Sequence, residues 1–291
     1  MKYLYNEQLI EDIELKIPIN DHGFLYGVGL FETFRVYDGV PFLFAEHIKR
    51  LKQGLKLIGI HQEIELSKMN ASLKYLLEAN YLKNAYVRIT VTAGVAPFGL
   101  PNEEYKNPAI IWQIKLLEPL SDSFILDKKA VILKIRQSSM ESEVKLKSLN
   151  FLNNILAKQE IFHLKNTEGI FLTNEGYVSE GIVSNIFFVK GGRLLTPGLE
   201  TGILNGITRE HVINLCIKNC IPFNEGLFNL KDLLNADEIF MTNSIQEIVP
   251  IINLENKNYP IRDNGITPML IKEYKASIRK VIERYKGSGK I

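Results

Sequence analysis

The sequence lacks the features that mark membrane-spanning or nucleic-acid-binding proteins. Among 291 residues, 35 Lys and Arg nearly balance 33 Asp and Glu, and the formal net charge is only +2. With the basic residues scattered along the chain, we expect no clustered basic surface for nucleic acid or for an anionic membrane. No run of about 18 apolar residues occurs, so no transmembrane helix is predicted.

The sequence also has few cysteines and no leader-like start. Residues 1–10 include Glu7 and lack both a basic leader and a sustained apolar run, so no signal peptide is expected. Cys216 and Cys220 are four residues apart in a predicted helix, which indicates reduced thiols on one buried face. A zinc site would need two further ligands nearby, and none is present. We therefore expect a cytoplasmic protein without a metal site.

Length and composition predict a globular protein of two domains. Hydrophobic residues make up 46% of the chain and charged residues 23%, which is typical of soluble proteins. A chain of 291 residues is long for a single core. Pro and Ser residues around 118–127 indicate a linker, so the domains are predicted at 1–120 and 121–291. Strands and helices are mixed in both, which predicts an α/β mixed (α+β) fold.

Hydrophobic periodicity locates the main elements. In the first half, strands are predicted at 2–5, 31–37, 86–92 and 109–116, and helices at 44–58 and 66–80. In the second half, strands are predicted at 130–135, 169–173, 177–179, 185–189 and 238–242, and helices at 150–164, from 208 and from 268. The last helix is expected to have Thr267 as N-cap and Pro268 at its first position.

Four polar residues occur in settings that suit an anionic cofactor, although each also has a structural explanation. A glycine-containing segment precedes Thr208, where a helix N-terminus could bind an anion or simply follow a turn. Arg50 lies beside the apolar face of its helix, as a phosphate ligand or as a surface ion-pair partner. Glu180 precedes an apolar strand and needs a partner if buried, either an Arg or a protonated ring nitrogen. Lys147 could form a Schiff base if its amine is neutral.

The order of these residues resembles the class IV aminotransferase family of pyridoxal-phosphate enzymes. The resemblance extends from residues 21–27 to residues 242–244, and its most specific part runs from Lys147 to Arg209. It implies the two-domain fold type IV of these enzymes, similar to D-amino-acid aminotransferase. It also implies a homodimer that acts on a small-molecule substrate with pyridoxal 5'-phosphate as cofactor.

The resemblance further implies a role for each residue. Lys147 corresponds to the Schiff-base lysine, Glu180 to the carboxylate that pairs with the pyridine nitrogen, and Arg50 to the phosphate-binding arginine. The remaining cofactor contacts are then expected from Ile207, Thr208, Asn243 and Ser244.

Within the family, the chain most resembles the bacterial aminodeoxychorismate lyases, at residues 21–27, 31–35 and 241–244. This implies conversion of 4-amino-4-deoxychorismate to 4-aminobenzoate and pyruvate in folate biosynthesis. Lys147 would remove a proton from the carbon that bears the amine, and Lys147 or Thr33 would protonate the departing enolpyruvate. Tyr26 and Arg88 are the expected substrate contacts.

An aminotransferase acting on D-amino acids or branched-chain amino acids is the alternative. D-amino-acid aminotransferases carry an Arg-x-His carboxylate trap after the strand that corresponds to 86–92, whereas residues 94–100 here read Gly-Val-Ala-Pro-Phe-Gly-Leu. In the other direction, Tyr86-Val87-Arg88 resembles the Tyr-x-Arg of branched-chain aminotransferases. Arg88 could therefore bind a substrate carboxylate in either enzyme or form a structural ion pair.

Overall fold

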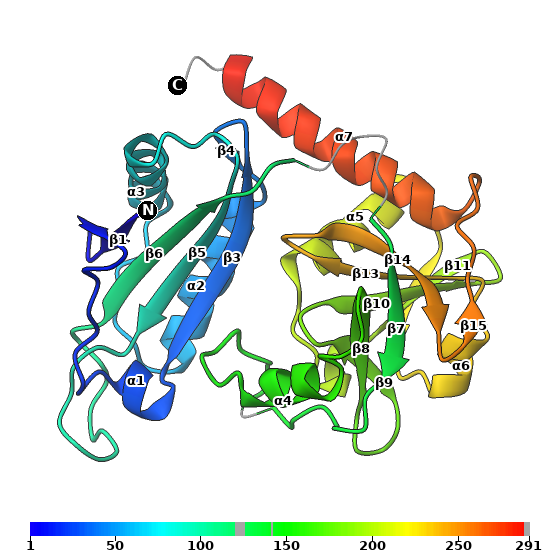
Figure 1. Ribbon diagram of the computed structural model, residues 1–291, viewed down its shortest axis with the longest axis horizontal. Helices are drawn as coiled ribbons and strands as arrows, with labels where there is room; N and C mark the ends of the chain where they lie inside the picture. The colour runs from blue at the N-terminus through cyan, green and yellow to red at the C-terminus, as the bar shows by residue number, and fades with distance from the viewer. Residues whose placement is uncertain (120–125, 141, 288–291) are drawn as a thin grey trace. The chain divides into compact units, whose positions relative to one another are not determined.

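The computed structural model describes residues 1–119, 126–140 and 142–287, which divide into two compact units (Figure 1). Unit 1 consists of Met1–Leu120, Leu146–Asn150 and Lys280–Ile291, and unit 2 of Ser121–Lys145 and Phe151–Arg279. The boundary expected between residues 120 and 121 lies outside the described residues, and the domain ranges 1–120 and 121–291 stay a prediction. The short segment that contains Lys147 groups with unit 1 and not with its neighbours in sequence.

Unit 1 is built on a six-stranded antiparallel sheet with two helices against one face. The strand order is β2-β1-β6-β5-β3-β4. The elements are β1 (Lys2–Tyr5), β2 (Gln8–Glu11), α1 (His22–Tyr26), β3 (Gly29–Tyr37), β4 (Val40–Pro41), α2 (Phe44–Leu57), α3 (Leu66–Ala79), β5 (Ala85–Thr92) and β6 (Ala109–Leu116). Figure 1 shows β3, β5 and β6 side by side with α2 and α3 along them.

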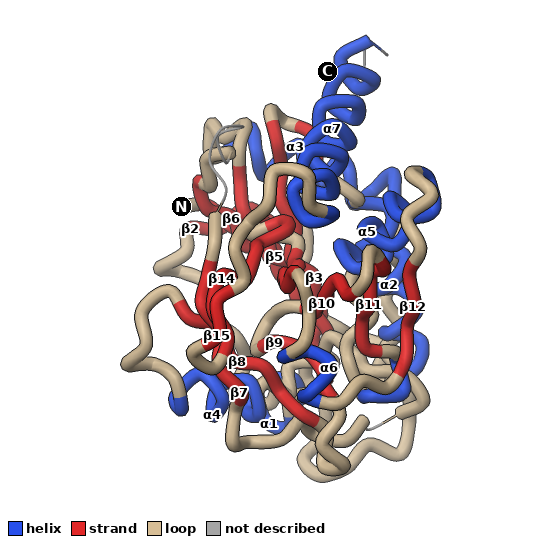
Figure 2. The backbone as a smooth tube through the Cα atoms, turned by 90° about the vertical axis from the view of Figure 1, so that its right-hand side faces the viewer, coloured by secondary structure: helices blue, strands red, loops and turns tan. Residues whose placement is uncertain are grey.

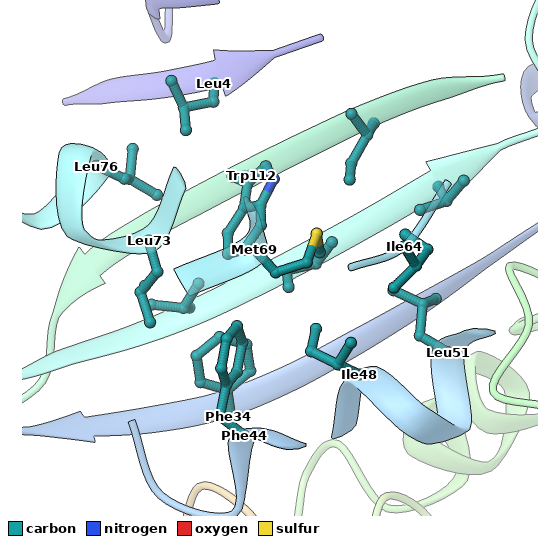
Figure 3. Packing of buried hydrophobic residues seen from close by; sticks show 14 of the residues in the cluster. Leu4, Phe34, Phe44, Ile48, Leu51, Ile64, Met69, Leu73, Leu76 and Trp112 are labelled. Carbon is teal, nitrogen blue, oxygen red and sulfur yellow. The ribbon is translucent and has the colours of Figure 1, made fainter. Parts of the chain in front are cut away.

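The core of unit 1 lies between α2, α3 and one face of this sheet. Every second residue of β5, such as Val87 and Ile89, is fully buried there, because side chains alternate between the two faces of a strand. Figure 3 shows Ile48 of α2, Leu73 of α3 and Trp112 of β6 in this layer. Each large apolar side chain buried in this way contributes about 1.5–3 kcal/mol. The opposite face of the sheet carries the alternate, more polar residues of the same strands.

Unit 2 is built on a nine-stranded mixed sheet. The order is β12-β11-β10-β13-β14-β7-β8-β9, and β15 pairs with β14. The elements are β7 (Lys128–Ile132), α4 (Leu152–Glu160), β8 (Thr167–Leu172), β9 (Val178–Gly181), β10 (Asn185–Lys190), β11 (Arg193–Pro197), η1 (Leu199–Thr201), α5 (Ile207–Lys218), β12 (Phe223–Gly226), α6 (Leu230–Leu234), β13 (Glu238–Asn243), β14 (Glu247–Leu254), β15 (Lys257–Asn258) and α7 (Ile266–Gly287). The residues of α7 up to Arg279 group with unit 2 and those from Lys280 on group with unit 1. Figure 2 shows β10, β11 and β12 side by side.

The sheet of unit 2 curls, because β9 at one end of the strand order also contacts β10. Phe188 and Met241 belong to its buried cluster, and the rings of Phe187 and Phe240 stack at 5.0 Å with an interplanar angle of 6°. Both Phe residues are fully buried. Over the described parts of the chain, no helix is both long enough and apolar enough to cross a membrane.

The predictions for the start of the last helix and for the burial of Cys220 are wrong, and the strand predicted at 130–135 and the helix predicted at 150–164 are shorter, as β7 and α4. The last helix, α7, begins at Ile266, so Thr267 lies in its first turn and is not its N-cap. The cap comes from another element: the Glu238 carboxylate on β13 accepts the N–H groups of Ile266 (3.0 Å) and Thr267 (2.7 Å). Cys216 is buried as expected, whereas Cys220 is exposed because α5 already ends at Lys218. Both thiols are free.

Candidate active site

Lys147 lies on a short segment that pairs with the start of β3 in unit 1. The Phe31 N–H donates to the Lys147 carbonyl (3.0 Å), and the Leu149 N–H donates to the Gly29 carbonyl (3.0 Å). A side chain at Gly29 would place its Cβ 2.6 Å from the Val91 carbonyl oxygen of β5 and 2.8 Å from Leu149 Cδ1, so only glycine fits between β5 and this segment. The Lys147 amine is 4.6 Å from the centroid of the Phe31 ring. The pairing thus holds the lysine beside an aromatic side chain of β3.

Arg88 stacks on the same aromatic ring. Its guanidinium carbon is 3.6 Å from the Phe31 centroid, and its Nε donates to Thr90 Oγ1 (3.1 Å). Burial lowers the pKa of Arg88, and the neighbouring Tyr86 partly offsets that effect. Among the described residues Arg88 forms no ion pair, and its contacts include the Phe31 ring and Thr90. The Lys147 amine and the half-buried Arg88 guanidinium therefore both lie over the Phe31 ring.

Thr33 and Tyr26 occupy different parts of unit 1. Thr33 is in register with Arg88 across β3 and β5, and paired residues of neighbouring strands project from the same face. Tyr26 lies at the end of α1, where its hydroxyl accepts the N–H of Gly99 (3.1 Å) and its ring packs edge-on against His22 (4.8 Å). Thr33 thus shares a face with Arg88, whereas Tyr26 contacts the 94–100 loop.

Arg50 is held by a buried carboxylate on the core-facing side of β3. Its Nε donates to Glu32 Oε1 and its Nη2 to Glu32 Oε2, both at 2.7 Å, and His47 Nδ1 also lies 2.7 Å from Glu32 Oε2. Burial alone would raise the pKa of Glu32, but the Arg50 guanidinium and His47 together lower that pKa to about 2. Burial keeps the pKa of His47 below its usual range despite the attraction of Glu32. Glu32 is therefore ionised at neutral pH.

This buried ion pair predicts a pH-dependent stability. Because the folded-state pKa of Glu32 lies below its usual value of 4.5, the stabilisation is present above about pH 4.5 and is lost as the pH falls toward 2. We expect Glu32→Gln to lower the free energy of unfolding by on the order of 3 kcal/mol at pH 7, with a smaller difference at pH 3. Urea unfolding of the wild-type and Glu32→Gln proteins between pH 3 and pH 7 measures this difference in the free energy of unfolding. A difference that does not change with pH would contradict the assignment.

In unit 2, Glu180 is buried and accepts three N–H donors. Gln137 Nε2 donates to Oε1 (2.7 Å), while the Leu204 N–H (2.9 Å) and Asn185 Nδ2 (3.5 Å) donate to Oε2. Gln137 also donates to the Gly202 carbonyl (3.2 Å). The carboxylate at the end of β9 is thereby tied to the loop that leads into α5. Donors of this kind stabilise the charged form of a carboxylate.

The N-terminus of α5 has the features of an anion site. Its N-cap residue, Gly206, provides no side-chain cap, so the first N–H groups, including those of Ile207 and Thr208, lack an intrahelical partner. A side chain at Gly206 would place its Cβ 2.1 Å from Asn185 Oδ1. The Thr208 hydroxyl lies 3.4 Å from the Ser244 hydroxyl, which follows β13. Backbone donors and two hydroxyl groups thus converge at one helix end.

Asn243 has a different role from the other predicted contacts. Its Oδ1 accepts the N–H groups of Ile245 (3.0 Å) and Gln246 (2.7 Å), the pattern in which an Asn side chain closes its own turn. The side chain shapes the turn after β13 and so places Ser244. No group of three or more His, Cys, Asp or Glu residues suited to a metal ion occurs among the residues described.

Three residues of these clusters were missed by reasoning from the sequence. Glu32 carries a detectable signal, because its strand neighbours on the same face, Leu30 and Phe34, are apolar and a charge between them must be buried and paired. Gln137 and Asn185 carry no such signal. Their amides become part of the site through hydrogen bonds to Glu180 from other parts of the chain.

Comparison with known proteins places the chain in one family. The family model for amino-transferase class IV matches residues 29–254. An aminodeoxychorismate lyase of Bacillus subtilis (strain 168) is 39% identical over 97% of this chain and 96% of its own length. A putative branched-chain-amino-acid aminotransferase of Methanocaldococcus jannaschii is 35% identical over 96% of each chain. A D-alanine aminotransferase of Bacillus licheniformis is 31% identical over 88% of this chain and 89% of its own.

Solved structures agree with this result. A branched-chain aminotransferase from Thermoproteus uzoniensis matches with a TM-score of 0.86 and 27% identity, over 98% of this chain and 97% of its own. A putative 4-amino-4-deoxychorismate lyase from Legionella pneumophila matches with a TM-score of 0.84 and 26% identity, over 91% and 97%. The mixed α/β fold of type IV expected from the sequence is confirmed. The chain therefore belongs to the class IV aminotransferase family of pyridoxal-phosphate-dependent enzymes.

Proposed function

We propose that the protein is an aminodeoxychorismate lyase that converts 4-amino-4-deoxychorismate to 4-aminobenzoate and pyruvate in folate biosynthesis. The observation that carries the proposal is that the Lys147 amine and the Arg88 guanidinium both lie over the Phe31 ring. Thr33 projects from the same face of the sheet as Arg88. An amine thus lies beside a cation that has no acidic partner among the described residues. The lyase substrate has carboxylates to neutralise such a cation. The similarity to the Bacillus subtilis lyase over nearly the whole chain supports the same reaction.

The residues present fit pyridoxal phosphate. In unit 2, the uncapped α5 N-terminus and the converging Thr208 and Ser244 hydroxyls suit a phosphate group. In unit 1, Arg50 carries a guanidinium of the kind that binds phosphate oxygens, which is the role that the family resemblance implies for it. Glu180 would hold a proton on the ring nitrogen, and Lys147 would attach the cofactor covalently. When bound, the cofactor supplies an electron sink for the carbon that loses its proton.

The remaining steps are carried by side chains of this chain. The Lys147 amine would take the proton from the substrate carbon that bears the amino group. The electron pair left behind expels enolpyruvate from the neighbouring carbon, and the ring becomes aromatic. Lys147 or the Thr33 hydroxyl then returns a proton to the methylene carbon of enolpyruvate, which yields pyruvate. Arg88 binds a carboxylate of the substrate throughout. A cytoplasmic homodimer, with no nucleic-acid or membrane partner, is part of this proposal.

An aminotransferase is the second candidate function. The Methanocaldococcus jannaschii relative and the Tyr86-Val87-Arg88 sequence favour a branched-chain substrate. Against a D-amino acid substrate, the 94–100 loop that Tyr26 contacts contains neither Arg nor His.

A paired assay on the same enzyme preparation tests the proposal. We expect 4-aminobenzoate and pyruvate to form in equal amounts from 4-amino-4-deoxychorismate, at a kcat/KM at least tenfold above that for D-alanine or leucine with 2-oxoglutarate. Fluorescence of 4-aminobenzoate and a coupled assay for pyruvate measure the two products. Faster turnover of either amino acid would make the protein an aminotransferase and end the lyase proposal.

A further inference from the structure

Glu32 is a buried charge to which the proposed reaction gives no task. Its side chain is 1% exposed and faces the apolar layer between the sheet of unit 1 and α2. A buried ion pair is a poor device for stability alone, because well-packed apolar residues of similar volume are often as stable or more stable. The carboxylate at this position therefore calls for an explanation beyond packing.

The geometry around Glu32 fixes the orientation of Arg50. Two parallel N–H···O bonds of 2.7 Å join the guanidinium to both carboxylate oxygens, which sets the plane of the guanidinium as well as its position. His47 contacts the same carboxylate at 2.7 Å and so restrains it from α2. Arg50 is 20% exposed, whereas Glu32 is enclosed. Glu32 can thus act on a ligand only through Arg50.

The same stretch of β3 also holds Lys147. Phe31, next to Glu32, binds the Lys147 carbonyl through its N–H and carries the amine over its ring. Neighbouring residues of one strand therefore set the position of both Arg50 and Lys147. A ligand attached to Lys147 at one end and bound by Arg50 at the other needs these two groups at a fixed separation.

We propose that Glu32 is a positioning residue, which holds the Arg50 guanidinium in the orientation that binds the cofactor phosphate at a fixed distance from Lys147. This inference rests on the phosphate-binding role proposed for Arg50. It predicts that Glu32 contributes to the affinity for the phosphate group and contributes nothing to the affinity for the rest of the cofactor.

Two probes separate positioning from general stabilisation: pyridoxal 5'-phosphate and pyridoxal, which lacks the phosphate. Each is titrated into the full-length protein stripped of cofactor, and visible absorbance gives the dissociation constant. We expect Glu32→Gln to weaken pyridoxal 5'-phosphate binding at least tenfold and to change pyridoxal binding less than twofold. In an Arg50→Met background, Glu32→Gln should cause no further loss. The inference would be overturned if Glu32→Gln weakened the binding of both probes equally. It would also be overturned if Glu32→Gln weakened pyridoxal 5'-phosphate binding by the same factor in the Arg50→Met background as in the wild type.

Two further variants guard against a folding defect. Glu32→Asp keeps the charge but is one methylene shorter, so it should weaken pyridoxal 5'-phosphate binding by less than Glu32→Gln and again leave pyridoxal unaffected. Glu238→Gln removes another carboxylate that accepts two N–H groups and should change neither constant. If Arg50→Met binds pyridoxal 5'-phosphate normally, the proposed role of Arg50 fails and this inference fails with it. The lyase assay is independent of these results.

Discussion

Lys147→Ala protein is expected to hold no covalently attached cofactor and to lose turnover by roughly 10²–10⁴-fold or more, the contribution typical of a positioned proton-transfer group. The Lys147 main chain pairs with β3 through the Phe31 N–H, and its amine lies over the Phe31 ring. Alanine keeps that main-chain bond but removes both the attachment point and the base. Mass spectrometry after borohydride reduction should find the cofactor adduct on Lys147 in the wild-type protein and none in the variant.

Lys145 provides a matched control for this experiment. It lies two residues away, and its amine donates to Ser138 Oγ at 2.9 Å. We expect Lys145→Ala to keep the reduced adduct and most of the activity. An adduct that persists in Lys147→Ala, or one that disappears in Lys145→Ala, would assign the cofactor to a different lysine.

The sheet of unit 1 shows which parts of the fold could be predicted from the sequence. The strands predicted at 86–92 and 109–116 are present as β5 and β6, because alternation of buried residues such as Val87 and Ile89 is a local pattern with a period of two. The start of α7 was not predictable in this way. Its cap is the carboxylate of Glu238, which is distant in sequence, whereas the Thr267-Pro268 pair mimics a local start signal.

In the candidate site, too, only features encoded in the local sequence could be predicted. The order of Lys147, Glu180 and Thr208 could be recognised because each lies in a characteristic segment of the chain. The partners of these residues could not, because they are brought together by tertiary structure. Gln137 is 43 residues from Glu180 along the chain, and nothing in its own neighbourhood distinguishes it from a surface amide. Arg50 illustrates a third case, because its local sequence allows either an ion pair or a phosphate contact, and the bond to the buried Glu32 leaves both possible at once.

Glu180→Gln is expected to keep the cofactor and to lose activity by roughly 10²-fold, the loss that follows removal of a group that stabilises developing charge. The carboxylate accepts N–H groups from Gln137 at Oε1 and from Leu204 at Oε2. A neutral amide presents an N–H to one of these donors, and it cannot hold a proton on the ring nitrogen as a carboxylate does. The phosphate contacts proposed for Arg50 and Thr208 are untouched, so cofactor content should be unchanged.

Two measurements on Glu180→Gln protein separate the expected loss from unfolding. Visible absorbance reports the bound cofactor per chain, and the initial rate of 4-aminobenzoate formation reports kcat. Glu238→Gln, in which a carboxylate with two N–H donors is changed elsewhere in unit 2, should keep both values close to those of the wild type. Full activity of Glu180→Gln would remove Glu180 from the proposed mechanism. Loss of the cofactor together with the activity would instead give Glu180 a role in cofactor binding. In that case, its hydrogen bonds to Gln137 and to the Leu204 N–H would be needed to hold the loop before α5, and with it the phosphate site, in place.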